Sequence, residues 1–207
     1  MLAPVFPQVL WRVRTTQPLV ALTFDDGPAP DHTPAVLEIL ARHGAHATFF
    51  LIGDRAARHP QFVARLRQEG HEVGSHYFTL SSTRRASDDE LLANLTRTED
   101  VLALDGRIKL YRPPGGFIRA SQIAVAQAHG YRIVLGSAYP YDPAHPPAAY
   151  IRWLVTKNLA PGVIVILHDG IADPSRTLAA LDSILVAGEQ KGLRFVSVGA
   201  LLEAAGQ

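Results

Sequence analysis

Residues 19–28 read Leu-Val-Ala-Leu-Thr-Phe-Asp-Asp-Gly-Pro, an apolar run that ends in two adjacent acids. The run predicts a buried strand, and Gly27-Pro28 predicts a turn directly after it. Asp25 and Asp26 would then lie at the carboxyl end of a strand, where α/β folds place their chemistry. One acid can bind a cation while the other, held ionised by that cation, acts as a base. These residues alone also fit a solvated Asx-type turn.

The rest of the chain repeats a helix that ends in glycine and is followed by a short apolar run. Gly44, Gly70, Gly130 and Gly192 mark these helix ends, since glycine commonly follows the last helical turn. The predicted strands cover residues 19–24, 47–51, 71–74, 109–111, 131–135, 163–167 and 193–196. The predicted helices cover residues 34–43, 61–68, 88–104, 121–129, 147–158 and 175–191.

Seven strands that alternate with helices indicate parallel βα units and an α/β fold. Polar groups follow many of these strands, which favours a closed or distorted (β/α) barrel over an open doubly wound sheet with one switch point. No linker or low-complexity tract interrupts the 207 residues, so we expect one domain over residues 1–207. A hydrophobic content of 47% is ample for its core.

The composition excludes several kinds of site and partner. The 20 basic and 19 acidic residues give a net charge of +1, so the charge does not suggest a nucleic acid or an anionic membrane as partner. Cysteine is absent, so a metal would be held by His, Asp or Glu, which suits zinc and its neighbours. No membrane span or signal peptide is recognisable. We expect a monomer. The chain as it stands would be cytoplasmic, unless an export leader precedes it, so the sequence leaves the location open.

Side chains able to do chemistry follow five of the predicted strands. They are Asp25 and Asp26, then His76, then Arg112, then the segment Tyr139–Asp142, and finally His168 with Asp169. Because strand ends in a barrel converge on one face, we expect these groups to meet in one pocket. Carboxylates, two histidines and an arginine together suggest metal-assisted hydrolysis.

Five short motifs stand in an order that a known family shares. They are Thr23–Pro28, Ala47–Phe50, Gly70–His76, Arg112–Pro114 and Ile166–Asp169. On these motifs the chain resembles the polysaccharide deacetylases, the NodB-homology family, which is carbohydrate esterase family 4. The resemblance runs over residues 19–198, nearly the whole chain. It implies a distorted (β/α) barrel and the removal of an acetyl group from an N-acetylated sugar.

The resemblance also implies a role for each matched residue. Asp25 resembles the general base, Arg112 the residue that orients this base, and His168 the general acid that protonates the leaving amine. Asp26 and His76 resemble ligands of a divalent metal, with zinc expected and cobalt, nickel or manganese as alternatives.

Four further residues are expected to bind substrate. Pro114 stiffens the loop that it shares with Gly115, and the backbone amide near Gly115 would help to hold the oxyanion. Tyr77 and Tyr141 would offer aromatic walls to the sugar, because amphipathic rings suit carbohydrate faces. Ordinary packing is the alternative role of these rings.

The chain departs from the family pattern at the metal site. The family usually has a second histidine four residues after the first, and here Leu80 stands at that position. Leucine cannot bind a metal, and a catalytic zinc normally has three protein ligands, so weak binding is expected. Asp88 or Asp89 could replace the missing ligand, or extra waters around a harder ion could complete the shell. Acids at a helix start are also explained by the helix dipole.

A second departure follows the fifth strand, where the family often has an Asp that tunes the acid histidine. Asp142 would be this carboxylate, or it would simply start a turn before Pro143. Without a carboxylate partner, His168 would have a weaker reason to be protonated near neutral pH.

The function predicted from these residues is metal-dependent de-N-acetylation of a carbohydrate that contains N-acetylglucosamine, such as peptidoglycan or a chitooligosaccharide. Two alternatives remain open. One is a catalytically impaired relative that binds sugar through an incomplete metal site. The other is a hydrolase of a different amide or of an O-acetyl ester. Members of the family commonly act on cell-wall polymers outside the cytoplasm.

Overall fold

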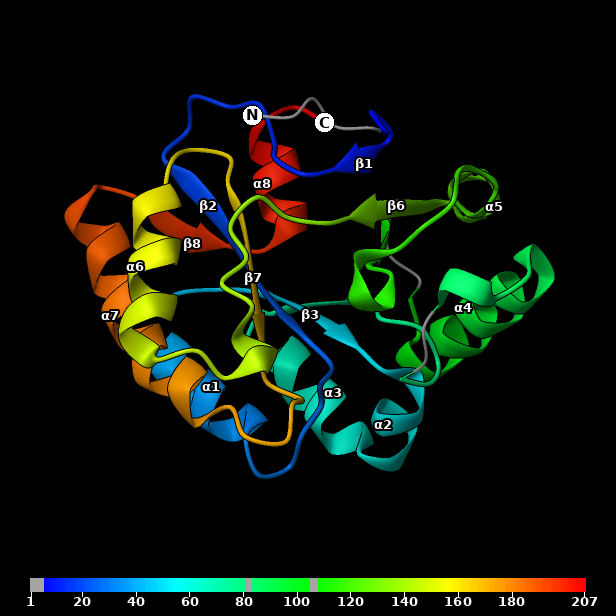
Figure 1. Ribbon diagram of the computed structural model, residues 1–207, viewed down its shortest axis with the longest axis horizontal. Helices are drawn as coiled ribbons and strands as arrows, with labels where there is room; N and C mark the ends of the chain where they lie inside the picture. Colours follow the sequence, from blue (N-terminus) through cyan, green and yellow to red (C-terminus); the bar gives the residue numbers. More distant parts are fainter. Residues whose placement is uncertain (1–5, 81–82, 105–107) are drawn as a thin grey trace.

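The computed structural model describes residues 6–80, 83–104 and 108–207 of the chain. Its centre is a single sheet in which all paired strands run parallel (Figure 1). The strands are β1 (Val9–Leu10), β2 (Leu19–Asp25), β3 (Thr48–Leu51), β4 (Glu72–Ser75), β5 (Lys109–Tyr111), β6 (Tyr131–Val134), β7 (Ile164–His168) and β8 (Arg194–Val196).

Helices surround this sheet (Figure 1). They are α1 (Thr33–Arg42), α2 (Gly53–Arg58), α3 (Pro60–Gln68), α4 (Asp88–Leu102), α5 (Ala120–Ala128), α6 (Ala148–Asn158), α7 (Ser175–Gln190) and α8 (Val198–Ala204). Among the described residues, no helix is both long and apolar enough to cross a membrane.

The sheet curls into a distorted barrel. Its strand order is β1-β6-β5-β4-β3-β2-β7, and β8 pairs with the first half of β2. Isolated bridges join Arg12 to Val163 and Ala138 to Val165, so that the segments beside β1 and β6 contact β7 at the other end of the sheet. The predicted α/β barrel is confirmed in this irregular form.

All seven predicted strands are present, each within one residue of its predicted bounds, and the six predicted helices are also found. The prediction missed β1, α2 and α8. These elements have two, six and seven residues, which is too short for a repeating apolar pattern to become visible in the sequence.

Strand β2 explains where the polar site lies. Alternate residues of a strand face opposite sides, and all seven residues of β2 are buried. Leu19 and Ala21 face the barrel interior, where they belong to the same apolar cluster as residues of α8. Thr23 and Asp25 continue this inner face toward the carboxyl end. The interior is therefore apolar at the α8 end and polar at the other end.

The opposite face of β2 anchors the outer helices. The large cluster on that side contains Val20, Leu22 and Phe24 together with apolar residues of α1 and α7. Because both faces of β2 are covered, the strand is held rigidly. The backbone that carries Asp25 and leads to Asp26 is therefore fixed in position.

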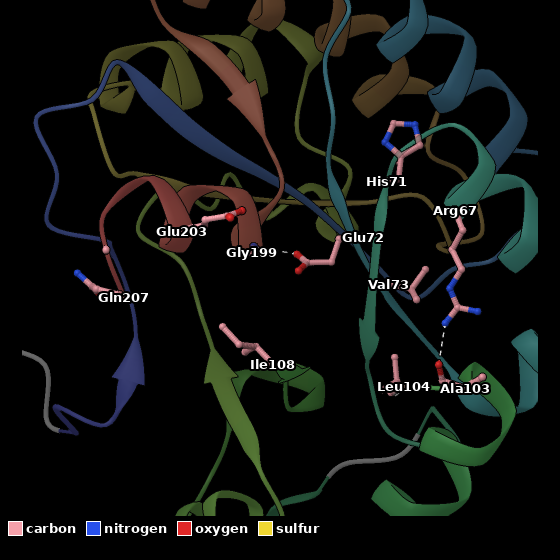
Figure 2. Close-up of a pocket in the computed structure, with 11 residues that line it drawn as sticks. Arg67, His71, Glu72, Val73, Ala103, Leu104, Ile108, Gly199, Glu203 and Gln207 are labelled. Carbon is pink, nitrogen blue, oxygen red and sulfur yellow. Dashed lines mark hydrogen bonds between the residues drawn. The ribbon is translucent and has the colours of Figure 1, made fainter. Parts of the chain in front are cut away.

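A cavity of about 710 Å³ lies at the amino ends of β4 and β5, away from the predicted chemistry (Figure 2). Arg67, Glu72 and Glu203 contribute charged groups to its wall. Glu72 points toward α8 and accepts a hydrogen bond from the Gly199 amide at 3.0 Å (Figure 2). None of the predicted site residues lines this cavity.

His71, on the same wall, should make folding sensitive to acid. It is buried, and its Nδ1 accepts a hydrogen bond from the Ala47 amide at 3.2 Å. Burial, and to a lesser extent the nearby His46, lower the pKa of His71 to about 4. The unfolded value is about 6.5, so this stabilisation is complete above pH 6.5 and is lost as the pH falls toward 4.

We expect the free energy of unfolding to drop by about 2 kcal/mol at pH 5 from this group alone. Urea unfolding between pH 7.5 and 4.5 would measure the drop. His71→Gln keeps a side-chain acceptor for the Ala47 amide but cannot gain the proton, so its stability should depend less on pH. The same pH dependence in His71→Gln and in the unmodified chain would contradict this prediction.

Candidate active site

The two acids after β2 diverge because the backbone turns between them. Asp25 is the last residue of the strand, whereas Asp26 has φ 71°, in the left-handed region. Few non-glycine residues adopt this conformation, and it often marks a functional constraint. The carboxylate of Asp25 turns toward Arg112, and that of Asp26 turns toward His76.

Arg112 fixes Asp25 from within the barrel. The arginine is buried, and its Nη1 donates to Asp25 Oδ1 at 2.6 Å and to Thr23 Oγ1 at 2.7 Å. Its other nitrogens donate to the backbone oxygens of Val134 and Leu135. A charge-assisted pair of this kind orients the carboxylate.

His76 and Asp26 form a pair that suits a cation. His76 Nδ1 donates to the backbone oxygen of Arg112 at 2.8 Å, because a carbonyl can only accept a hydrogen bond. In the neutral ring, Nε2 then has a free lone pair, and it lies 3.4 Å from Asp26 Oδ1. This oxygen is buried and has no hydrogen-bond partner among the described residues.

Two acceptors that face each other fit a positive ion between them, and a ligand histidine is commonly fixed through its other nitrogen in this way. Burial opposes ionisation of Asp26, but the hydrogen bond and charge that His76 supplies when Nε2 also carries a proton, and more weakly His168 and Arg55, outweigh burial and lower the pKa of this carboxyl. A cation between the two side chains would take the place of that proton. Asp26 is therefore available as an anionic ligand. These two residues fit a divalent metal.

A third protein ligand is not found in the part of the chain that the structure describes. Leu80 has 60% of its surface exposed. Within residues 6–80, 83–104 and 108–207, no three His, Cys, Asp or Glu side chains are grouped to hold a metal. Asp88 is engaged elsewhere, because its Oδ1 accepts from Ser121 at 3.0 Å and from Arg119 at 3.4 Å. Asp88 is in the first turn of α4, directly after the N-cap Ser87. This is the position at which the helix dipole favours an acid, which was the alternative explanation for Asp88.

His168 ends β7 and is held by Asp142. The buried Asp142 carboxylate accepts from His168 Nδ1 at 3.0 Å, from the His168 amide at 2.9 Å and from Thr177 Oγ1 at 3.0 Å. His168 Nε2 is left facing Asp25 Oδ2 at 4.0 Å. Asp142 is therefore the carboxylate partner of His168, which is the first of its two predicted roles.

The contact with Asp142 favours the protonated form of His168. Burial lowers the pKa of His168, but the Asp142 hydrogen bond and the charges of Asp25, Asp142 and Asp26 outweigh it and raise the pKa to about 9. The ring is therefore protonated at neutral pH. Its contribution to stability is fully present below the unfolded pKa of about 6.5 and is lost as the pH rises through 9.

We expect Asp142→Asn to lower the pKa of His168 by at least about 1 unit, since one close charge typically shifts a pKa by 1–3 units. Histidine proton resonances of the metal-free protein would measure the change. Thr177→Val is the matched control, because it removes a hydrogen bond to Asp142 but keeps the carboxylate charge. If His168 still titrated near 9 in Asp142→Asn, Asp142 would not be the residue that raises its pKa.

The residues expected to bind substrate lie in different environments. Tyr141 has 66% of its surface exposed, and its ring stacks on Tyr139 at 4.4 Å between centroids. The Tyr139 ring lies 5.8 Å from that of His168, so the two tyrosines form a wall beside this histidine. Gly115 is exposed, with φ 67°, whereas Pro114 is buried beneath it.

The prediction that Tyr77 offers an aromatic wall to the sugar is wrong, and its alternative role, packing, is the one found. Only 3% of its surface is exposed, and its ring packs in an apolar cluster with Leu91, Tyr111 and their neighbours. The backbone at Tyr77 has φ 72°, a conformation that the sequence did not reveal. Tyr77 supports the loop after β4 and offers no exposed surface to a sugar.

Three contacts of the site were not predicted. Arg55 binds the loops after β2 and β7, and Thr177 binds Asp142. Asp169 was noted only as part of a motif, yet it is fully buried and accepts from Thr33 Oγ1 at 2.5 Å. Burial raises the pKa of Asp169 to about 7. No sequence pattern links Arg55 or Thr177 to these partners, which are far away along the chain.

The chain is similar in sequence to a known protein family and to named members of it. The sequence profile of the polysaccharide deacetylases matches residues 12–134. The chain belongs to the polysaccharide deacetylase family. A peptidoglycan-N-acetylglucosamine deacetylase of Bacillus cereus is 40% identical over 94% of this chain and 92% of its own length. The predicted membership and the hydrolase class are confirmed.

Two solved structures are informative relatives of this polysaccharide deacetylase family member. The Bc1960 peptidoglycan N-acetylglucosamine deacetylase has a TM-score of 0.89 and 32% identity, over 94% of this chain and 92% of that one. The other is a mutant of BA3943, described as a family 4 pseudoenzyme with restored enzymatic activity. It has a TM-score of 0.87 and 26% identity, over 97% and 73% of the two chains. The fold therefore occurs both in a named deacetylase and in a pseudoenzyme.

Proposed function

We propose that this chain is a divalent-metal-dependent hydrolase that removes N-acetyl groups from carbohydrate containing N-acetylglucosamine, as peptidoglycan or chitooligosaccharide. The observation that carries the proposal is the arrangement of Asp25 Oδ2 opposite His168 Nε2, 4.0 Å apart, beside the Asp26–His76 pair. The named peptidoglycan deacetylase at 40% identity supports the choice of substrate.

In the proposed reaction Asp25 is the base. Its Oδ1 is bound by Arg112, so its Oδ2 takes a proton from the water that attacks the amide carbon. His168 gives its Nε2 proton to the amide nitrogen as the carbon–nitrogen bond breaks. The products are acetate and the free amine of the sugar, and the acid and base each work from a positioned side chain.

Asp26 and His76 are the proposed metal ligands, for zinc or for cobalt, nickel or manganese. The chemistry that such a cation supplies when bound is polarisation of the amide carbonyl and activation of water. The amide near Gly115 is proposed to stabilise the oxyanion. The exposed Tyr141, stacked on Tyr139, would support the sugar. We further propose a single monomeric domain whose motif-bearing core is residues 19–198.

A sugar-binding protein with little activity is the second candidate. Leu80 stands where a third ligand would be expected, and a pseudoenzyme shares the fold. A hydrolase of another amide or of an O-acetyl ester is the third, because the same base and acid would serve those bonds.

Acetate release by the purified protein, with zinc or cobalt added, would separate these functions. The substrates are chitooligosaccharides, peptidoglycan and an O-acetylated sugar, and Asp25→Asn and Asp26→Ala are the controls. We expect acetate from the N-acetylated sugars, reduced about 10²- to 10⁴-fold in Asp25→Asn. Release from the ester alone would favour the third function. Sugar binding without release from any substrate would favour the second.

A further inference from the structure

Arg55 lies on the short helix α2 and reaches the loops that carry the proposed catalytic groups. Its Nη1 donates to the backbone oxygen of Asp26 at 2.7 Å and to that of Gly170 at 2.5 Å. Asp26 follows β2, and Gly170 follows His168 at the end of β7. One guanidinium nitrogen, with its two hydrogens, thus binds both loops.

The loops need such a link because their strands have already ended. The β2–β7 pairing stops at Asp25 and His168. Beyond it, the Asp169 and Gly170 amides reach the Asp25 oxygen only at 3.3 and 3.4 Å, which is long for a hydrogen bond. The two bonds from Arg55 are shorter and charge-assisted, and therefore stronger.

The two loops also approach each other closely at Gly170. A Cβ at this position would lie 2.1 Å from the Asp26 oxygen and 2.7 Å from Arg55 Nη1. The close approach leaves no space for a side chain, and the Arg55 nitrogen lies in the gap. Displacing it would let the loops separate.

We propose that Arg55 is a positioning residue, which holds the loops after β2 and β7 at the spacing that places Asp25 opposite His168 and Asp26 opposite His76. The hydrogen bonds of Arg55 go to backbone oxygens and to none of the proposed reacting atoms. Its charge also lowers the pKa of Asp26 weakly, and Arg55→Lys, which keeps this charge, separates that effect from loss of the two bonds. The effect on rate rests on the proposed function of the site, whereas the effect on loop spacing does not. A displacement of about 1 Å in such a site can cost about 100-fold in rate.

The test compares Arg55→Met and Arg55→Lys with Arg58→Met. Arg58 is on the same helix, 61% of its side chain is exposed, and its ion pair is with Asp54, one turn away. We expect Arg55→Met to lower kcat for acetate release at least about 10-fold with KM nearly unchanged. Arg55→Lys should recover part of this loss, because it keeps a donor and a charge. Arg58→Met should match the unmodified enzyme.

Assays far below each variant's melting temperature separate positioning from mere stabilisation. A residue that only anchors α2 would lower the melting temperature in Arg55→Met but leave kcat per folded molecule unchanged, and this result would overturn the proposal. Failure of Arg55→Lys to recover any rate would overturn it too.

A second measurement keeps the proposal testable if the unmodified chain releases no acetate, which would count against the proposed function alone. Amide hydrogen exchange of residues 26–30 and 169–172 should be faster in Arg55→Met than in Arg58→Met, with the rest of the barrel unchanged. Equal exchange of these segments in the two variants would refute the positioning role of Arg55.

Discussion

Replacing Arg112 with methionine is expected to lower the free energy of unfolding by about 3–5 kcal/mol, the cost of breaking a buried ion pair from one side. Only 2% of Arg112 is exposed, and its guanidinium lies 4.1 Å above the Phe50 ring. Without it, the buried Asp25 carboxylate and two backbone oxygens would lose the hydrogen bonds that Arg112 donates. Deacetylation should be lost in the same variant.

Chemical denaturation at pH 7 would measure this loss. Arg42→Met is the control, because Arg42 forms an exposed ion pair with Asp182, and exposed pairs contribute only about 0–1 kcal/mol. The double variant Asp25→Asn/Arg112→Met should lose less stability than the sum of the single losses, since Asp25 no longer carries an unpaired charge. A loss below about 1 kcal/mol in Arg112→Met would contradict the prediction.

The second large effect is expected at position 80. Leu80→His would place an imidazole four residues after His76, where the family usually has its second histidine ligand. Because Leu80 is exposed, the substitution should cost little stability. We expect zinc affinity to rise at least about 10- to 100-fold, the size of effect that even residues behind the ligands have on metal binding.

Competition with a coloured chelator would measure the affinity of the unmodified chain and of Leu80→His. Leu80→Ser controls for loss of the apolar side chain, and Asp26→Ala in the Leu80→His background should abolish the gain. Unchanged zinc affinity in Leu80→His would mean that position 80 does not reach the Asp26–His76 pair. A gain in both affinity and acetate release would identify a weakened enzyme, whereas a gain in affinity alone would favour the sugar-binding alternative.

The strands and the polar groups at their ends could be predicted from the sequence for a physical reason. Apolar runs bounded by glycine define parallel strands, and parallel strands bring their carboxyl ends together. Asp25, Asp26, His76, Arg112 and His168 were therefore expected in one place, and the structure brings them together. Their chemical roles stay predictions.

What could not be predicted depends on backbone conformation and on contacts between distant residues. The left-handed backbone at Tyr77 buries a ring that was expected to face the sugar. Arg55 and Gly170 are 115 positions apart, and Asp142 and Thr177 are 35 apart. A periodic sequence pattern does not indicate which distant residues are in contact. For the same reason it does not indicate which group would be the third ligand of the metal.

The apolar contacts between α8 and the inner face of the barrel have a consequence for polymers. Apolar side chains of α8 and of the strands fill the far end of the barrel interior. A glycan strand cannot be threaded through the molecule. It would lie across the end of the barrel that carries Asp25 and His168, with one acetylated sugar directed toward these two residues. Sugars within a long chain would then be as accessible as those at its ends.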